Sequence, residues 1–415
     1  MSTALLTDRY ELTMLESALH FGLAGRRAVF EVFARRLPTG RRYGVVAGQG
    51  RLRGLLDEFV FGPDELAALS GVVGEQTCAW LERRRLGADI FAYAEGETYF
   101  PGSPVLTVES CFGEGLLLET LVLSVLNHDS AVASAAARMV TAAGGRPLIE
   151  MGSRRTSEQA AVAAARAAYV AGFARTSNLE AGRRHGVPTA GTNSHAFTLA
   201  AVDEKAAFRA QVATQGAGTT LLVDTYVTEQ GIRNAVEVAG SELGAIRLDS
   251  GDLIEETRRA RALLDELGAT GTRIVVTGDL DEHSILGLAA TPADSYGVGT
   301  SVVTGSGAPS AGFVYKLVAI AESDAGDTTL RPVAKTSSGK ATLGGRKWAA
   351  RVPGGELLRG TPGGFPAGAR MLQGPLMGDD LRAARDRCRE SLAELPESAR
   401  RLSPGDPAWR AKLEV

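Results

Sequence analysis

Short apolar runs alternate with Ala-rich or amphipathic stretches between about residues 145 and 300. The apolar runs predict seven strands, at residues 147–151, 173–176, 187–190, 220–223, 245–248, 273–276 and 295–298. Strands that alternate with helices build parallel sheets, so this region predicts either a doubly wound sheet or a β/α barrel. The sequence lacks a repeat of roughly 20 to 50 residues, which excludes a solenoid.

The flanking regions follow other patterns. Residues 7–14 predict a capped helix start with acidic residues in its first turn, and residues 116–126 predict a buried helix. Residues 28–33 alternate apolar and polar side chains, as a half-buried strand does, and residues 91–99 with 105–109 predict a hairpin. Residues 313–320 are expected to close the barrel as its last strand, and residues 379–402 predict an exposed helix.

Composition narrows the class of ligand. The 415 residues are 44% hydrophobic with a net charge of −3, and the basic residues are dispersed, so neither nucleic acid nor a membrane is an expected partner. Cys78, Cys111 and Cys388 form no CxxC pair, which excludes a sequence-readable zinc site and is typical of a reducing compartment. The N-terminal residues carry charges in place of a signal-peptide core. We expect a small ligand and a cytoplasmic location.

Each of the seven predicted strands between residues 145 and 300 ends on polar residues. In a parallel barrel the carboxyl ends of the strands meet at one mouth, where barrel enzymes keep their active sites. Solvation of a turn explains any single cluster, but a cluster at every strand end favours a site. The clusters are Ser153-Arg154-Arg155, Ser177-Asn178, residues 192–195, Asp224, residues 249–252 with Arg247 before them, Thr277-Gly278-Asp279, and residues 297–300.

Two of these clusters suit an anion. Ser153-Arg154-Arg155 precedes a run with capping-box spacing, Thr156-Ser157-Glu158-Gln159, and free amides beside two guanidinium groups bind a multiply charged anion such as diphosphate. A pair of surface arginines is the alternative. Gly278 and the run Gly297-Val298-Gly299-Thr300 let the backbone approach a ligand closely, as the phosphate-binding turns after the last strands of barrels do.

The other clusters supply acids and a histidine. Arg247 and Asp249 are two residues apart at the end of one strand, so their side chains project to the same side and engage either one substrate or each other. His195 follows a short turn and is either a catalyst or a helix cap. Asp224 is expected to orient His195 and set its tautomer. Together these groups predict a site for a phosphorylated sugar.

Six motifs in this order resemble those of the nicotinate phosphoribosyltransferase family, which are type II phosphoribosyltransferases. The motifs are Thr7-Asp8-Arg9-Tyr10-Glu11-Leu12-Thr13-Met14, Glu150-Met151-Gly152-Ser153-Arg154-Arg155, Thr176-Ser177-Asn178, Gly191-Thr192-Asn193-Ser194-His195, Ile246-Arg247-Leu248-Asp249-Ser250-Gly251-Asp252 and Tyr296-Gly297-Val298-Gly299-Thr300. The resemblance implies an ATP-coupled ligase of NAD biosynthesis that joins nicotinate to phosphoribosyl diphosphate with Mg²⁺. It also implies a homodimer with active sites at the subunit interface.

The fold that the resemblance implies is an irregular α/β barrel with an α+β domain built from both chain ends. Residues 1–130 would form the N-terminal α+β domain, and residues 131–325 the barrel domain that carries the active site. Residues 326–415 would pack with the N-terminal domain.

We expect His195, Asp224 and Asp249 to be the catalytic residues, and the resemblance further implies roles for single residues. His195 is similar to the histidine that ATP phosphorylates, and Tyr10 would lie on the pyridine ring from the neighbouring subunit. Arg247 would bind the nicotinate carboxylate, Arg154 the diphosphate and Asp249 the ribose hydroxyls. The remaining expected contacts are Gly278, Gly297 and Gly299 with the 5′-phosphate, and Thr192 and Thr300 within the same motifs.

Two positions bear on the pyridine substrate. Met151 stands where relatives often have an aromatic residue, so its thioether would pack on the ring less strongly than a stacked aromatic. Asn178, beside Ser177, stands where nicotinamide-using relatives have an aspartate that would repel a carboxylate. The Ser177-Asn178 pair therefore favours the acid over the amide.

Three other functions are considered. A nicotinamide phosphoribosyltransferase is the nearest, and the Ser177-Asn178 pair disfavours it. A barrel aldolase would need a desolvated Schiff-base lysine, for which the candidates are Lys316, Lys335 and Lys340, all outside the strand-end clusters. A non-catalytic nucleotide sensor would use the same mouth, but the presence of His195 argues against it.

Overall fold

The computed structural model describes residues 2–323, 329–337, 342–378 and 380–414. The chain divides into two compact units, one formed by Met1–Ala131 with Ser310–Val415 and the other by Val132–Pro309. We call them the terminal unit and the central unit. Within the described ranges, no helix combines the length and apolar character needed to cross a bilayer.

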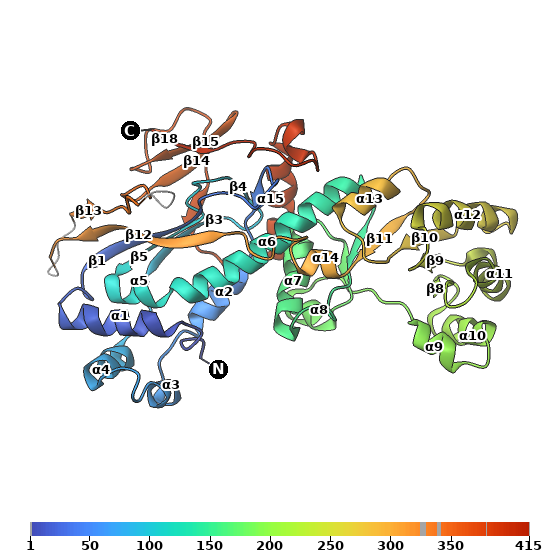
Figure 1. Cartoon of the computed structure of the whole chain (residues 1–415), viewed down its shortest axis with the longest axis horizontal. Coiled ribbons are helices and arrows are strands. Elements are labelled where there is room, and N and C mark those ends of the chain that lie inside the picture. The colour runs from blue at the N-terminus through green and yellow to red at the C-terminus, as the bar shows by residue number, and fades with distance from the viewer. Residues whose placement is uncertain (1, 324–328, 338–341, 379, 415) are drawn as a thin grey trace. The chain divides into compact units, whose positions relative to one another are not determined.

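The terminal unit is an α+β structure around an antiparallel sheet of six strands in the order β13-β12-β1-β5-β3-β17 (Figure 1). Smaller sheets have the orders β16-β14-β15-β18 and β2-β4. The elements are α1 (Arg9–His20), β1 (Arg27–Ala34), β2 (Gly44–Val45), α2 (Gln49–Asp57), α3 (Pro63–Ala68), α4 (Glu75–Arg83), β3 (Asp89–Tyr93), β4 (Thr98–Tyr99), β5 (Leu106–Cys111), α5 (Phe112–Leu117), α6 (Glu119–Ala143), β12 (Phe313–Ala321), β13 (Leu330–Pro332), β14 (Trp348–Val352), β15 (Gly355–Arg359), β16 (Arg370–Met371), β17 (Gln373–Pro375), α15 (Leu381–Ala393), η2 (Glu397–Arg400) and β18 (Ala411–Leu413). Helix α6 continues past Ala131 into the central unit.

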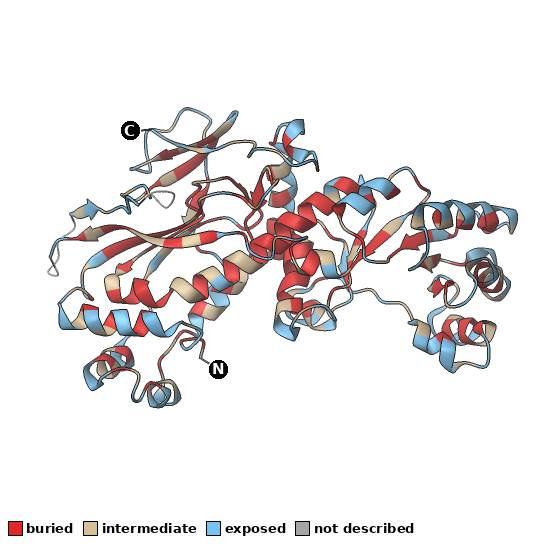
Figure 2. Cartoon of the chain, viewed as in Figure 1, coloured by how far each residue is buried: buried red, intermediate tan, exposed pale blue. Residues whose placement is uncertain are grey.

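Strand β1 lies between β12 and β5, and this position explains two differences from the sequence patterns. Nearly every residue of β1 is buried, so it is not the half-buried strand that alternation predicted (Figure 2). Its polar member Glu31 is buried against Lys347, at 2.8 Å between Oε2 and Nζ. Residues 313–320 do not close a barrel, because β12 pairs antiparallel with β1 along its length. The boundary expected at residue 325 therefore falls at Pro309.

The other predicted elements of the terminal unit are present with shifted ends. Helix α1 begins after Asp8 with Glu11 in its first turn. The 91–99 and 105–109 segments meet as β3 and β5, while Thr98 and Tyr99 form β4 and pair with β2. The C-terminal helix is α15; residue 379, where its prediction began, lies outside the described residues.

The central unit contains one parallel sheet of six strands, β7-β6-β11-β10-β9-β8. Its elements are β6 (Leu148–Glu150), α7 (Glu158–Val170), β7 (Arg175–Thr176), α8 (Leu179–His185), α9 (His195–Ala200), α10 (Glu204–Gln215), β8 (Thr220–Leu222), α11 (Thr228–Ala239), η1 (Gly240–Glu242), β9 (Ala245–Leu248), α12 (Leu253–Glu266), β10 (Arg273–Val276), α13 (Glu282–Leu288), β11 (Ser295–Val298) and α14 (Thr300–Val303). Apolar strands and helices that alternate in sequence have formed the predicted α/β layer.

Six of the seven predicted parallel strands are members of this sheet, and the prediction for 187–190 is wrong. That segment makes only an isolated parallel bridge, between Thr189 and Thr176. The sheet is a curled half-barrel that does not close, because the strand order leaves β7 and β8 at its two ends. The α/β barrel-type fold expected for this region is confirmed in this open form.

Local sequence sets where several helices begin. The carboxylate of Asp252 accepts from the amides of Ile254 and Glu255, which caps α12. Asp281 and Ser284 form a capping box at the start of α13. Asp252 is the last residue of the cluster after β9, and Asp281 lies two residues beyond the cluster after β10, so polar residues near the strand ends serve the fold as well as the site.

Candidate functional site

The register of the parallel strands brings the predicted clusters of the central unit to one level. Arg247 on β9 pairs with Leu222 on β8, Leu248 with Val276 on β10, and Val276 with Tyr296 on β11. Residues that directly follow these strands therefore stand side by side at the carboxyl edge of the sheet. This is the edge where ligands bind in open α/β sheets.

Arg247 is the centre of the cluster. Its guanidinium donates to three side chains from three segments: Nε to Thr277 Oγ1 at 2.9 Å, Nη1 to Thr192 Oγ1 at 3.2 Å, and Nη2 to Asp249 Oδ1 at 3.0 Å. Arg247 and Asp249 thus project to the same side, as their spacing predicted, and they also form the ion pair that was the alternative. The remaining donor capacity of a half-buried guanidinium suits an anionic ligand group.

Asp249 is held as a carboxylate. Burial favours a raised pKa for this group, but the hydrogen bonds from Thr277 and Arg247 and the charge of Arg247 outweigh burial, so its pKa lies below the usual value. Asp249 therefore presents acceptors to hydroxyl groups at neutral pH.

Asp224 does not orient His195, and that prediction is wrong. Its Oδ2 accepts from the Asp249 amide at 2.8 Å and from the Ser250 hydroxyl at 2.7 Å. Its Oδ1 is buried and has no hydrogen-bond partner among the described residues. Because β8 and β9 run in register, Asp224, two residues after β8, meets the turn after β9 more readily than a side chain on a separate helix.

His195 begins α9 and is held by other groups. Its Nδ1 lies 3.1 Å from Thr225 Oγ1, and its Nε2 lies 3.8 Å from Asp249 Oδ2. The imidazole is half-buried and stands beside the Arg247–Asp249 pair. One nitrogen therefore has a hydroxyl partner while the other faces the carboxylate, an arrangement that suits an imidazole used as a nucleophile.

Three glycines and Met151 also lie at the carboxyl edge of the sheet, beside the Arg247 cluster. A Cβ added to Gly297 would lie 2.7 Å from Met151 Sδ and 2.5 Å from Thr277 Cγ2, so only a glycine allows this close packing. Gly278 has φ +112°, and a Cβ on it would lie 2.7 Å from the Asp249 carbonyl oxygen. A Cβ on Gly299 would approach the Met151 carbonyl oxygen to 3.4 Å. Met151, Gly297, Gly299 and Gly278 are thus neighbours in the cluster.

The structure does not bring every predicted residue into these contacts. Arg154 and Ser177 are exposed on the loops that follow β6 and β7, and Thr300 is exposed at the start of α14. Both polar atoms of the Asn178 side chain are hydrogen-bonded within the protein: Oδ1 accepts from the Ala181 backbone N–H at 2.9 Å, and Nδ2 donates to Ser153 Oγ at 3.0 Å. Tyr10 belongs to the terminal unit, 44% exposed near the start of α1.

Sequence reasoning assigned no role to Thr225, Thr277 or Glu150. Thr277 directly follows the predicted strand 273–276, at the position that pairs across from Asp249, so its place was readable from register. Thr225 lies one residue beyond the Asp224 cluster. Glu150 ends β6 as a wholly buried carboxylate, and an acid at the end of an apolar strand was the signal that could have identified it.

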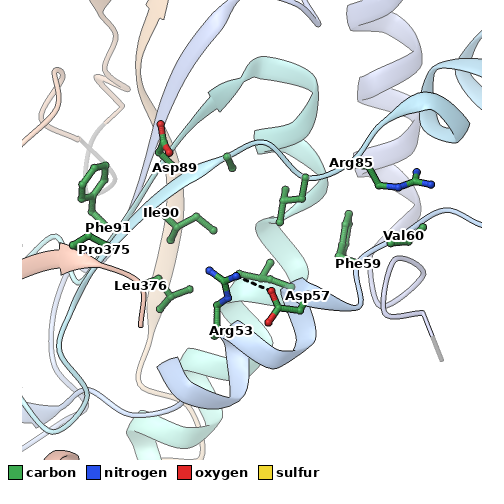
Figure 3. Close-up of a pocket in the computed structure, with 13 residues that line it drawn as sticks. Arg53, Asp57, Phe59, Val60, Arg85, Asp89, Ile90, Phe91, Pro375 and Leu376 are labelled. Carbon is green, nitrogen blue, oxygen red and sulfur yellow. Dashed lines mark ion pairs between the residues drawn. The ribbon is translucent and has the colours of Figure 1, made fainter. Parts of the chain in front are cut away.

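The terminal unit has a separate hollow of about 450 Å³ (Figure 3). Buried Leu56, Phe59 and Leu376 line it, and Arg53 and Asp57 form an ion pair on it at 2.8 Å. It contains none of the predicted site residues, and its two arginines, Arg53 and Arg85, are balanced in charge by Asp57 and Asp89. We therefore place the candidate site at the strand ends of the central unit.

Comparison with known proteins shows the family of the chain. Residues 5–127 match the family model described as the nicotinate phosphoribosyltransferase N-terminal domain, and residues 132–306 match that of the quinolinate phosphoribosyl transferase C-terminal domain. A Mycobacterium tuberculosis protein named nicotinate phosphoribosyltransferase pncB1 is 56% identical, over 97% of this chain and 94% of its own length. The chain belongs to the nicotinate phosphoribosyltransferase family.

Two further members of the nicotinate phosphoribosyltransferase family are similar over most of the chain. A Bacillus subtilis nicotinate phosphoribosyltransferase is 38% identical, over 85% of this chain and 73% of its own length. The crystal structure of human nicotinic acid phosphoribosyltransferase superposes with a TM-score of 0.82 at 26% identity, covering 98% of this chain and 97% of the human one. The expected family and fold class are confirmed.

Membership of the nicotinate phosphoribosyltransferase family leaves no support for the aldolase alternative. The central unit contains a single lysine, Lys205 on α10, and its Nζ is bonded to Glu237 at 2.5 Å. Lys316 and Lys335 belong to the terminal unit, and Lys340 lies outside the described residues. A Schiff-base lysine at the strand ends is therefore missing from the central unit.

Proposed function

We propose that this protein joins nicotinate to 5-phosphoribosyl 1-diphosphate, giving nicotinate mononucleotide and diphosphate, and couples this reaction to ATP hydrolysis. The observation that carries the proposal is the contact cluster of Arg247, Asp249 and His195 in a chain that is 56% identical to a named nicotinate phosphoribosyltransferase. An arginine, an acid and a histidine at one sheet edge match the three needs of binding a carboxylate, holding a ribose and accepting a phosphoryl group.

Each residue of the cluster would take one part of the reaction. Arg247 would bind the nicotinate carboxylate, and Asp249 would accept from the ribose hydroxyls. Gly278, Gly297 and Gly299 would let backbone amides reach the 5′-phosphate, and Arg154 would bind the diphosphate. Glycosyl transfer passes through an oxocarbenium-like state, so stabilising the leaving diphosphate matters more than a strong base.

His195 would accept the phosphoryl group of ATP, which is the covalent step of the proposal. The nucleophilic imidazole nitrogen would form the N–P bond while the bond to ADP breaks, and water would later hydrolyse the phosphohistidine. Thr225 supports this role because it engages Nδ1 and so restrains the ring.

Mg²⁺ fits the acids of the cluster. No group of three His, Cys, Asp or Glu side chains that could hold a metal occurs among the described residues, so the protein offers no complete cage. Mg²⁺ is commonly bound by one or two carboxylates together with substrate phosphates. Asp224, whose buried Oδ1 lacks a partner, and Asp249 are the carboxylates that would hold it. The ion would supply charge neutralisation of the leaving diphosphate.

The proposal includes a homodimer in the cytoplasm with sites shared between subunits. Tyr10, Met14 and Phe21 are 44%, 37% and 73% exposed, and their spacing places them on one side of α1 and its end. An exposed apolar stripe of this kind supports contact with a second copy.

Three free cysteines support a reducing compartment.

The acid is the proposed substrate, with nicotinamide as the competing one. The Asn178 side chain is hydrogen-bonded to Ser153 and caps α8. It supports selectivity for the acid only because an asparagine at this position does not repel a substrate carboxylate as an aspartate would. Arg247 is the group that favours an anionic ring substituent. Comparing turnover of nicotinate and nicotinamide by the purified protein decides between them, since faster turnover of the amide would contradict the proposal.

The direct test is diphosphate release from nicotinate and phosphoribosyl diphosphate, measured with and without ATP. We expect His195→Ala to lose stimulation by ATP and to keep weak ATP-independent transfer, because the substrate-binding groups remain. Full ATP stimulation in this variant would remove the phosphohistidine role. Absence of diphosphate release by the wild-type protein under saturating substrates would instead favour a non-catalytic sensor.

A further inference from the structure

Glu150 is a buried acid for which the proposed reaction has no role. It ends β6, is fully buried, and accepts from the Gly152 amide through Oε1 and from the Thr176 hydroxyl through Oε2, both at 2.5 Å. Burial raises the pKa of Glu150, although the two hydrogen bonds act to lower it. No basic side chain contributes to this shift. Burying an acid without a basic partner costs stability, so its presence points to a use other than stability.

Hydrogen bonds from Glu150 run through two loops. The Thr176 hydroxyl has one hydrogen, which it donates to Glu150. Its oxygen therefore acts as an acceptor for the backbone N–H of Asn178, at 2.9 Å. Asn178 in turn donates from Nδ2 to Ser153 Oγ at 3.0 Å. Ser153 is joined through the chain to Gly152, whose backbone N–H donates to Glu150. The contacts therefore form a closed ring between the loops after β6 and β7.

The ring restrains the segment that carries Arg154. A Cβ on Gly152 would lie 2.2 Å from Val303 Cγ1 and 3.0 Å from the Gly299 carbonyl oxygen, so the loop packs against α14 on one side. On its other side the Gly152 amide is bonded to Glu150, and its carbonyl accepts from the Arg155 amide at 2.8 Å. Arg154 lies inside this turn and is exposed. The backbone of an arginine that must meet an anion is thus held from both sides.

We propose that Glu150 is a positioning residue for phosphoribosyl diphosphate: through Gly152, and through Thr176, Asn178 and Ser153, it holds the turn that carries Arg154 in one conformation. This inference rests on the proposed function, because it takes the anion at Arg154 to be the diphosphate of that reaction. Glu150 touches no substrate and acts only through the loop.

The test is Glu150→Gln, which keeps size and burial. The glutamine carbonyl accepts from Gly152, but its NH₂ only donates, so the Thr176 hydroxyl loses the acceptor of its hydrogen and the ring is weakened at this bond. At metal sites, loss of a partner that orients a binding group costs about 10-fold or more in affinity or activity, and we expect an effect of this order here. We expect KM for phosphoribosyl diphosphate to rise about 10-fold, with KM for nicotinate and kcat changed less than about 3-fold. Glu242→Gln, at an exposed glutamate just before the amino end of β9, is the control and leaves all three constants unchanged.

A binding measurement separates this inference from the proposed function. Calorimetric titration with inorganic diphosphate is expected to show about 10-fold weaker binding by Glu150→Gln than by the wild-type protein. If the wild type releases no diphosphate from its substrates but this difference appears, the proposed function fails and the positioning role stands. Equal diphosphate affinity and equal KM in the two proteins would overturn the positioning role.

Ser153→Ala keeps the test decisive if Glu150→Gln does not fold. This change removes the last bond of the ring and leaves Glu150 and its two bonds in place. We expect KM for phosphoribosyl diphosphate to rise about 3-fold, with thermal stability near that of the wild type. An unchanged KM and an unchanged affinity for inorganic diphosphate would contradict the role of the ring.

Discussion

Single carboxylates in this protein have opposite acidities because their neighbours differ. Asp249 receives bonds from Arg247 and Thr277, which hold its pKa below the usual value despite burial. Glu11 on α1 is fully buried and receives the amide and hydroxyl of Thr120 at 2.8 and 2.6 Å, with no basic partner in the balance. Burial, with the charges of Glu119 and Asp8 adding to it, raises the pKa of Glu11 to about 7. One acid is fixed as a charge for ligands, and the other titrates near neutrality.

Glu11→Gln is expected to remove a pH dependence of stability. The pKa of Glu11 rises from 4.5 to about 7 on folding, so its favourable contribution is full below pH 4.5 and is lost as pH rises through 7. Relative to Glu11→Gln, the wild type should lose on the order of 2 kcal/mol between these limits. Urea unfolding of both proteins at a series of pH values measures this, with the exposed Glu82→Gln as control. Parallel pH profiles for wild type and Glu11→Gln would contradict it.

Elements of the central unit meet through turns that only glycine allows. Gly278 follows β10 with φ +112°, and there is no room for a Cβ beside the Asp249 carbonyl oxygen. The next residue, Asp279, has φ +48°, so two successive positions after β10 have unusual backbone conformations. Such conformations persist when the surrounding structure enforces them, and they concentrate at functional sites.

Gly278→Ala is therefore expected to destabilise the protein by about 1 to 3 kcal/mol, from backbone strain and the close approach to Asp249. It should also raise KM for phosphoribosyl diphosphate, because the turn is the proposed 5′-phosphate site. Gly287→Ala is the matched control, since Gly287 lies within α13 with open space at its Cβ position, and a gain of about 0.5 to 1 kcal/mol is expected. Denaturant midpoints compare the two, and equal shifts would show that the turn is unstrained.

At the scale of the whole molecule, the expected site residues fall in two units. Arg247, Asp249 and His195 belong to the central unit, whereas Tyr10 belongs to the terminal unit, which both chain ends build together. A homodimer with shared sites would bring Tyr10 of one copy to the cluster of the other. The exposed stripe of Tyr10, Met14 and Phe21 supports that arrangement.

Mixing two inactive variants tests whether sites are shared. Tyr10→Ala and Arg247→Ala homodimers are each expected to have low activity at nicotinate concentrations near the wild-type KM. Random assortment makes half of the dimers mixed, and each mixed dimer has one intact site, so co-expression should restore about a quarter of wild-type activity. Activity no higher than the average of the two parents would show that Tyr10 acts within its own chain or not at all.

The sequence alone determined which segments form the central sheet and which residues follow them. Strands β9, β10 and β11 begin and end at the predicted residues, because short apolar runs between polar turns are a local signal. The clusters around Arg247, Asp249 and His195 were readable for the same reason. The order of the six motifs also sufficed to identify the family.

Only the tertiary structure decided which partners these segments and side chains take. Residues 187–190 read as a strand but make one bridge, and residues 313–321 leave the central unit to pair with β1. Asp224 binds the turn after β9, while Thr225 holds His195. Strand periodicity states that a segment is extended but carries no information about its neighbour, because pairing depends on contacts between residues far apart in sequence.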